Sequence, residues 1–190
     1  MAIEKMGVIG GGTMGSGIAE VAARNAVQTV VVEIDAALAE AAQRRLEGSA
    51  AKAVARNKMS EEEQESLLAH LSFSTEYDGL ADADLVVEAV VEMPEVKFEV
   101  FRTLDQVVKA DGILASNTSS IPIVEIGGVT QRPGQVHGKH IINPATLHPQ
   151  VEHNTSQQTQ SAPHHMVEKF VTDQLGKHPN PTRERAGVVV

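Results

Sequence analysis

The chain opens with Lys5-Met-Gly-Val-Ile-Gly-Gly-Gly-Thr-Met-Gly15, in which a short apolar run leads into three glycines with G-x-G-x-x-G spacing. Apolar residues then recur at helical intervals, which predicts a strand, a tight glycine turn and a helix. Gly10 permits the turn, Gly12 lets a phosphate group approach the backbone, and Gly15 lets the helix pack closely on the strand. Because free N–H groups at the start of a helix attract an anion, this stretch predicts a pyrophosphate site.

A glycine-rich turn alone is a weak signal, but a second apolar run supports it. Thr29-Val-Val-Val32 is followed by Glu33, 18 residues after Gly15. An acidic side chain near this separation holds the adenosine ribose in dinucleotide-binding folds and repels a 2′-phosphate. We therefore expect NAD rather than NADP, with Glu33 on the ribose and Asp35 as the second candidate. The alternative interpretation of Glu33 is a solvated loop carboxylate.

Length and composition limit the function classes. A chain of 190 residues with 42% apolar content is expected to form one domain with its own core. The net charge of −9 and the lack of a Lys/Arg stripe argue against nucleic-acid or membrane-surface partners. There is no cysteine, which excludes disulfides and thiolate chemistry. Because no signal pattern or membrane-spanning run is present, we expect a soluble, cytoplasmic protein.

Strand and helix patterns alternate along most of the chain. An alanine-rich stretch and a capping box at Ser60–Glu63 predict a helical hairpin over about residues 36–71. Buried-strand patterns follow at residues 84–90 and 112–116, and Pro94 opens the helix between them. The alternation predicts an α/β fold: a Rossmann-type, doubly wound, mainly parallel sheet with an inserted helical hairpin.

The last third of the chain is less regular. Residues 135–142 fit another strand and residues 166–175 fit a helix, with Gly176 as its C-terminal cap. Residues 143–161 between them are polar and contain two prolines. We expect less regular structure there than in the preceding alternation.

Four motifs together carry a resemblance to a known family. They are Val8-Ile-Gly-Gly-Gly-Thr-Met-Gly-Ser-Gly-Ile-Ala19, Asp84-Leu-Val-Val-Glu-Ala-Val-Val-Glu92, Ala115-Ser-Asn-Thr-Ser-Ser120 and Gly138-Lys-His-Ile-Ile-Asn-Pro144. In order and separation they resemble the N-terminal domain of the 3-hydroxyacyl-CoA dehydrogenases, which include the bacterial 3-hydroxybutyryl-CoA dehydrogenases. The resemblance covers nearly the whole chain and implies reversible NAD-dependent oxidation of a 3-hydroxyacyl-CoA to the 3-ketoacyl-CoA.

The resemblance assigns catalytic roles to four positions. It implies that His140 is the catalytic base, that Glu152 orients it, and that Ser119 and Asn143 hold the substrate oxygen or the histidine. An imidazole suits the proton removal because it titrates near neutral pH, and a carboxylate on its other nitrogen fixes the tautomer. The structural alternatives are a turn hydroxyl for Ser119 and a residue-before-proline turn for Asn143.

The resemblance also assigns binding residues. Glu92 and Lys97 fall where the family places an acidic and a basic residue beside the cofactor, and an exposed pair is the alternative. Ser49 and Arg56 fall near the family's serine and basic residue that meet the CoA nucleotide, and a solvated helix face is the alternative. The expected cofactor-binding residues are Gly10, Gly12, Thr13, Met14, Gly15, Glu33, Glu92, Lys97 and Asn117.

The histidines in the second half of the chain raise the question of a metal site. No pair of them has an established ligand spacing with acidic support, so we expect no metal. The residues in question are His137, His140, His148, His153, His164 and His165.

Two departures from the family pattern affect these expectations. The segment Pro149-Gln-Val-Glu-His-Asn-Thr155 is polar where the family has an apolar strand, which predicts an edge strand or a poorly held Glu152. The family continues with a helical domain that supplies its dimer contact and closes the acyl site. We therefore expect an NAD-binding domain over residues 1–185, the start of a linker to that absent domain at 186–190, and a homo-oligomer, such as a dimer.

Three other functions fit the same sequence. The chain could bind NAD without catalysis, and replacement of His140 by Ala would then have no effect. It could be a structural protein of the same fold, as some lens proteins resemble the family, and would then not bind NAD. It could also oxidise a small β-hydroxyacid, and would then be indifferent to Arg56→Ala.

Overall fold

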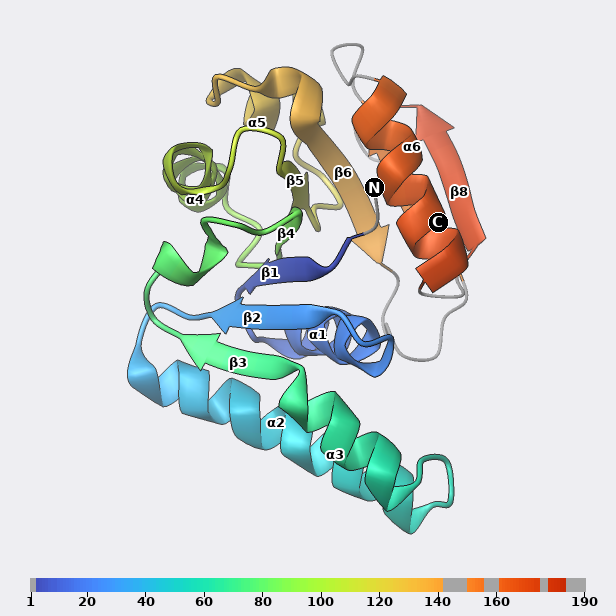
Figure 1. The fold of residues 1–190 in the computed structure, drawn as a ribbon. Coiled ribbons are helices and arrows are strands. Elements are labelled where there is room, and N and C mark those ends of the chain that lie inside the picture. Colours follow the sequence, from blue (N-terminus) through green and yellow to red (C-terminus); the bar gives the residue numbers. More distant parts are fainter. Residues whose placement is uncertain (1–2, 142–149, 156–160, 175–177, 184–190) are drawn as a thin grey trace.

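The computed structural model describes residues 3–141, 150–155, 161–174 and 178–183. These residues form one eight-stranded sheet with the strand order β3-β2-β1-β4-β5-β6-β7-β8 (Figure 1). The strands are β1 (Lys5–Ile9), β2 (Gln28–Val32), β3 (Leu71–Ser74), β4 (Leu85–Glu88), β5 (Ile113–Ser116), β6 (Val136–Ile141), β7 (Gln150–Thr155) and β8 (His178–Arg183). The six strands from β3 to β6 in this order are parallel, which confirms the doubly wound, mainly parallel sheet.

Helices connect the strands and cover both faces of the sheet. Three short helical turns complete the connections: η1 (Asp78–Leu80), η2 (Pro133–Gln135) and the π-helical η3 (Phe170–Gln174). The α-helices are α1 (Thr13–Arg24), α2 (Ala36–Ala55), α3 (Glu61–Ala69), α4 (Pro94–Val107), α5 (Ile123–Gly128) and α6 (Ser161–Lys169). None of the helices within the described ranges is long and apolar enough to cross a bilayer.

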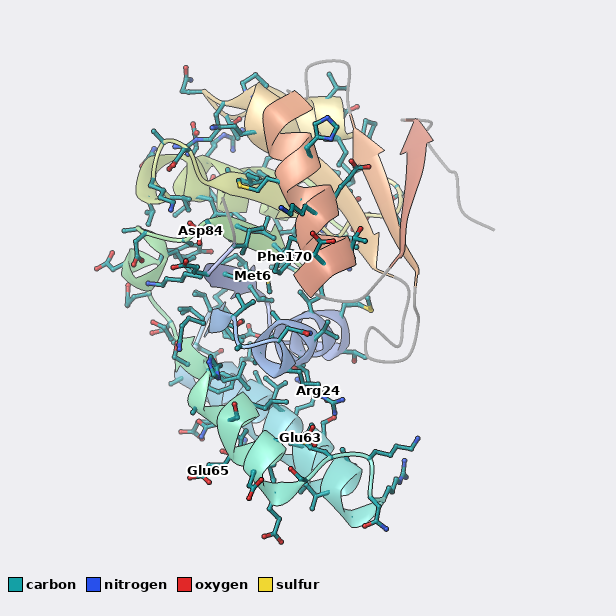
Figure 2. All side chains as sticks on the ribbon, turned by 45° about the vertical axis from the view of Figure 1, so that its right-hand side comes forward. Met6, Arg24, Glu63, Glu65, Asp84 and Phe170 are labelled. Atoms are coloured by element: carbon teal, nitrogen blue, oxygen red, sulfur yellow. The ribbon has the colours of Figure 1, made fainter. Side chains whose placement is uncertain are left out.

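Successive side chains of the central strands point alternately into two separate hydrophobic cores, one on each face of the sheet. Leu85 and Val87 of β4 join the core under α1 and α6, whereas Val86 joins the core under α4 and α5. This is the period-two alternation of a strand that is buried on both faces. Met6 of β1 and Phe170 of η3 belong to the first core and lie close together in Figure 2. The C-terminal helical segment therefore closes one face of the sheet.

The predicted helical hairpin is present, with one correction. Ser60 and Glu63 form the expected capping box, with Ser60 Oγ accepting the Glu63 N–H and the Glu63 carboxylate accepting the Ser60 N–H. In Figure 1, α2 and α3 lie side by side beyond β3. The second helix ends at Ala69, and Leu71 already begins β3, a strand that the pattern of residues 36–71 did not predict. Four residues are too few to establish a strand period beside a helix.

The expectation of an edge strand around Glu152 is wrong. Gln150–Thr155 forms β7, which pairs antiparallel with β6 on one side and parallel with β8 on the other. Ladder hydrogen bonds come from the backbone, so a polar sequence can occupy this position. The strand β8 was not predicted because it contains Pro179 and Pro181, and such strands are confined to sheet edges, where β8 lies.

Candidate active site

The strand order locates a crevice at the carboxyl ends of the parallel strands. The strand β1 pairs with β2 on one side and β4 on the other, so the chain reverses its direction of winding at β1. Doubly wound folds bind dinucleotides at such a switch point, with one mononucleotide on each half of the sheet. The motif residues follow these same strand ends: Gly10 follows β1, Glu33 follows β2 and Asn117 follows β5.

The glycine turn between β1 and α1 has the geometry that its spacing predicts. Gly10 has φ of +91°, and a Cβ there would lie 2.9 Å from the carbonyl oxygen of Ala89. A Cβ on Gly15 would lie only 1.7 Å from the Gly10 carbonyl oxygen. Gly12 is exposed, and a Cβ there would meet nothing within 4 Å. Gly10 and Gly15 are therefore required by packing, whereas Gly12 leaves open space beside the backbone that fits a pyrophosphate.

Thr13 and Met14 occupy the first turn of α1 and differ in their surroundings. Thr13 is exposed at the start of the helix, where backbone N–H groups are without intrahelical partners. Met14 is half-buried and packs against the core under α1. Of the two, Thr13 is the one placed to meet an anion.

Glu33 lies against the glycine turn, and Asp35 does not. The Oε1 atom of Glu33 accepts the Gly11 N–H at 2.6 Å, while within the described residues its Oε2 has one longer contact, at 3.4 Å from the Ile34 N–H. This leaves acceptor capacity on a half-buried carboxylate at the turn, as ribose hydroxyls require. Asp35 is the N-cap of α2, where its Oδ1 accepts the Leu38 N–H at 2.8 Å. The solvated-loop interpretation of Glu33 is therefore wrong.

Two residues at the glycine turn were not singled out from the sequence. Arg45 of α2 donates from Nη1 to the Gly11 carbonyl oxygen, and Ser16 Oγ donates to the same oxygen at 2.7 Å. Glu33 thus holds the N–H side of Gly11, while Arg45 and Ser16 hold its carbonyl side. Arg45 also brings a positive charge to the turn of an acidic chain. No motif spacing links α2 to this turn, so only the tertiary structure reveals the contact.

A buried ion pair lies at the ends of β4 and β5. Lys97 Nζ contacts Glu88 Oε1 at 2.7 Å and Oε2 at 3.0 Å, and both side chains are 0% exposed. Glu88 Oε1 also accepts the Val90 N–H at 2.7 Å, and its Oε2 accepts the Ser116 hydroxyl at 2.6 Å. The exposed-pair interpretation of Lys97 is therefore wrong. Sequence reasoning missed Glu88, although a carboxylate closing the apolar strand Leu85–Glu88 was a signal for it.

Glu92 organises the turn after β5. Its Oε2 lies 3.2 Å from Lys97 Nζ, and its Oε1 accepts the Thr118 hydroxyl, the Ser119 N–H at 3.0 Å and both the N–H and hydroxyl of Ser120. Burial would raise the pKa of Glu92, but the Thr118 hydrogen bond and the Lys97 charge outweigh it and lower the pKa to about 2. Glu92 is therefore a fixed anion at neutral pH.

Ser119 and Asn117 lie at the same strand ends. Ser119 is exposed and attached to Glu92 through its backbone N–H. Asn117 is half-buried, and its N–H donates to the Glu88 carbonyl oxygen at 2.7 Å. Together with Glu92 they occupy the β4–β5 half of the crevice, opposite Glu33 on the β2 half.

The backbone of β6 and β7 brings two predicted catalytic residues together. In the antiparallel register, His140 is the Cα partner of Glu152. Residues directly opposite each other in a sheet are close neighbours across the ladder. The sequence-based concern that β7 fails to place Glu152 is therefore wrong at the level of the backbone. Asn143 lies outside the described residues.

Of the two predicted CoA residues, Ser49 lies on α2 and Arg56 is the C-cap residue that follows it. Ser49 Oγ donates to Glu20 Oε2 at 2.7 Å, and the buried Glu20 also pairs with Arg24 at 2.9 Å. Arg56 is exposed and caps the end of the 20-residue α2, about 30 Å along the helix from its start. Ser49 thus has a protein partner, whereas Arg56 presents its charge to solvent.

No metal site accompanies these groups in the described part of the chain. Among residues 3–141, 150–155, 161–174 and 178–183, no three His, Asp or Glu side chains gather in a way that could hold an ion.

The sequence of the domain that forms this crevice matches a known protein family. The family model described as "3-hydroxyacyl-CoA dehydrogenase, NAD binding domain" matches residues 5–185. The chain belongs to this family. NAD is the cofactor of this 3-hydroxyacyl-CoA dehydrogenase domain, and the open backbone at Gly12 and the carboxylate of Glu33 fit it.

Individual relatives agree with the family match. The chain is 43% identical over its whole length to a 3-hydroxybutyryl-CoA dehydrogenase of Mycobacterium tuberculosis and 40% identical over 80% of its length to a probable one of Bacillus subtilis. It covers 66% of the first and 53% of the second, so it spans about two thirds or less of these relatives.

Solved structures show the same fold at high similarity. The chain superposes over its full length on M. tuberculosis FadB2 with a TM-score of 0.98 at 43% identity, covering 67% of that chain. It also matches (S)-3-hydroxybutyryl-CoA dehydrogenase PaaH1 of Ralstonia eutropha over its full length with a TM-score of 0.95 at 34% identity, covering 66% of that chain. Both structures share the fold of this chain over its full length.

Proposed function

We propose that this chain provides the NAD-binding and proton-transfer half of a 3-hydroxyacyl-CoA dehydrogenase. The reaction is the reversible oxidation of a 3-hydroxyacyl-CoA to the 3-ketoacyl-CoA, as in fatty-acid or butyrate metabolism. The observation that carries the proposal is the register of β6 and β7, which pairs His140 with Glu152 beside the strand that leads to Ser119. This backbone pairing supports the assignment of His140 as the base and of Glu152 as the carboxylate that orients it.

The chain's own residues divide the chemistry. His140 takes the proton of the 3-hydroxyl group, and Glu152 fixes the tautomer of the imidazole and stabilises the imidazolium. Ser119 and Asn143 hold the substrate oxygen. NAD, when bound, supplies the acceptor for the hydride that leaves the same carbon. In the reverse direction His140 returns the proton to the oxygen of the 3-ketoacyl group.

The two halves of the crevice divide the cofactor. Gly10–Gly15 would hold the pyrophosphate and Glu33 the adenosine ribose, because these groups surround the open turn on the β1–β2 side. Asn117, Ser119 and Glu92 would adjoin the nicotinamide half, because they end β4 and β5. Lys97 is buried beneath these residues and would hold Glu92 in place through their ion pair.

The acyl-CoA would extend along the helical hairpin. Arg56 is the stronger part of this proposal because an exposed guanidinium can pair with a phosphate. Ser49 would have to exchange its hydrogen bond to Glu20 for one to the ligand. We further propose a cytoplasmic homodimer: the acidic, cysteine-free composition supports the location, and a monomer at micromolar concentration in sedimentation would contradict the dimer.

The test is NADH consumption with acetoacetyl-CoA. Replacing His140 by Ala removes the base, so turnover is expected to fall about 10²- to 10⁴-fold. His165→Ala is the matched control, because its imidazole is 76% exposed on α6 and is expected to leave turnover unchanged. Equal turnover by His140→Ala and the parent chain would contradict the proposal.

The share of its relatives that the chain spans motivates a second candidate function. A chain that spans 66% of its relatives could retain the cofactor half alone, as an NAD-binding module without catalysis. NADH binding without any acetoacetyl-CoA reduction would favour this candidate. Turnover of a small β-hydroxyacid that is indifferent to Arg56→Ala would instead point to a substrate without CoA.

A further inference from the structure

The ion pair of Glu88 and Lys97 has no direct part in the proposed reaction. Both side chains are fully buried, so neither is exposed to a ligand. Taking two charges out of water is costly, and their attraction offsets this only when further hydrogen bonds satisfy the remaining donors and acceptors. The further hydrogen bonds of this pair all lead to the same end of the crevice.

Glu88 ties together the two loops that leave β4 and β5. Its carboxylate accepts the Val90 N–H at 2.7 Å in the loop after β4 and the Ser116 hydroxyl at 2.6 Å at the end of β5. Its backbone carbonyl accepts the Asn117 N–H at 2.7 Å. One buried residue therefore sets how the two loops stand relative to each other.

Lys97 connects this buried anchor to the surface of the crevice. Its ammonium reaches Glu88 at 2.7 Å and Glu92 at 3.2 Å, so it is shared between the two carboxylates. Glu92 in turn gathers the donors of residues 118–120, including the Ser119 N–H at 3.0 Å. The contacts form an unbroken series from Glu88 to the exposed Ser119.

We propose that Glu88 and Lys97 are positioning residues for the nicotinamide half of the crevice and act through Glu92 on Ser119. This rests on the NAD site described under the proposed function. Because Glu33 and the glycine turn take the adenosine half of a doubly wound site, the β4–β5 half is left for the nicotinamide. Lys97 thus acts on the cofactor through Glu92 and not by direct contact.

The experiment compares two probes, NADH and ADP-ribose, which lacks the nicotinamide. Replacing both partners, as Glu88→Gln with Lys97→Met, avoids leaving one buried charge unpaired. The affinity for NADH is expected to fall about tenfold, equivalent to one lost hydrogen bond to a charged group. The affinity for ADP-ribose is expected to change less than about twofold, since Gly12 and Glu33 are untouched.

A matched control separates positioning from general destabilisation. Asp105 and Arg132 form another ion pair with 2.7 Å separation and side chains only 10% and 15% exposed, and it joins α4 to the segment before β6. Asp105→Asn with Arg132→Met is expected to lower the melting temperature without changing the ratio of the affinities for NADH and ADP-ribose. Equal loss of both probes in the Glu88/Lys97 variant, or no loss of NADH affinity, would overturn the proposal.

The route through Glu92 has its own test. Glu92→Gln alone is expected to reproduce the selective loss of NADH affinity. Adding the Glu88/Lys97 substitutions to Glu92→Gln is then expected to cost less than about a further twofold, because residues acting in series are not additive. Losses that multiply would overturn the route and indicate direct action of Lys97.

The proposed reaction can fail without this inference failing. If the parent chain does not reduce acetoacetyl-CoA but the Glu88/Lys97 variant still loses affinity for NADH and not for ADP-ribose, the dehydrogenase proposal is contradicted and the positioning role stands. If the parent chain turns over and the probes are not separated, the positioning role is contradicted and the reaction stands.

Discussion

The two halves of the crevice are built in different ways. On the β1–β2 half, the turn is shaped by glycine backbone: Gly10 and Gly15 pack against other peptide groups, and Gly12 leaves the ligand room. On the β4–β5 half, the loops are held by side-chain charge, with Lys97 buried between Glu88 and Glu92. One dinucleotide site thus combines a backbone shape that admits the ligand with loops held in place by charged side chains.

The largest expected effect comes from breaking the charged half at one residue. Lys97→Met leaves Glu88 buried without its partner, so we expect a loss of about 3–5 kcal/mol in the free energy of unfolding. Urea denaturation measures this loss. Because Glu88→Gln removes the unpaired charge, the double variant is expected to regain most of the lost unfolding free energy. If the double variant is no more stable than Lys97→Met, buried charge does not hold the β4–β5 half together.

In the glycine turn of the β1–β2 half, alanine is expected to destabilise the fold at Gly15 but not at Gly12. Gly15→Ala brings a Cβ onto the Gly10 carbonyl oxygen, so we expect a loss of about 1–3 kcal/mol or more in the free energy of unfolding. Gly12→Ala has open space and is expected to change stability by less than about 0.5 kcal/mol while weakening NADH binding. Equal stabilities of the two variants, measured by thermal unfolding, would contradict the division of roles between these glycines.

A smaller effect is expected from the single carboxylate on the backbone half. Glu33→Gln keeps an acceptor for the Gly11 N–H but removes the charge that repels a 2′-phosphate. The preference for NADH over NADPH is expected to fall about tenfold, which corresponds to about 1.4 kcal/mol. Asp35→Asn is the control, because asparagine also caps helices and Asp35 caps α2. A change of preference in the control would assign the ribose to Asp35 instead.

The smallest expected effect is a pH dependence of stability that comes from Glu92 on the β4–β5 half. The pKa of Glu92 is lowered from 4.5 to about 2 in the folded chain, so the ionised form stabilises the fold. That contribution is complete above about pH 4.5 and is lost as the pH falls toward 2. The difference in unfolding free energy between the parent chain and Glu92→Gln is therefore expected to shrink between about pH 6 and about pH 3. A difference independent of pH would contradict a charged Glu92.

The contrast between the halves also explains what the sequence could predict. Glycine spacing predicted the turn because few other residues tolerate φ of +91° or a 1.7 Å approach. The buried Lys97 was harder, because its partners Glu88 and Glu92 come from the end of β4 and the loop that follows it. A signal was nevertheless present, since Lys97, Phe101 and Leu104 recur at helical spacing on the buried face of α4. The pairing of β7 and β8 depended on backbone hydrogen bonds that polar and proline-containing sequence does not reveal.

The most direct test of the divided crevice is a crystal structure of the chain with NAD⁺ bound. We expect the adenosine ribose within hydrogen-bond distance of Glu33, the pyrophosphate against the backbone of Gly12, and the nicotinamide beside Ser119. A dinucleotide bound in the opposite direction, with its nicotinamide on the Glu33 side or away from the carboxyl ends of β1 and β4, would contradict it.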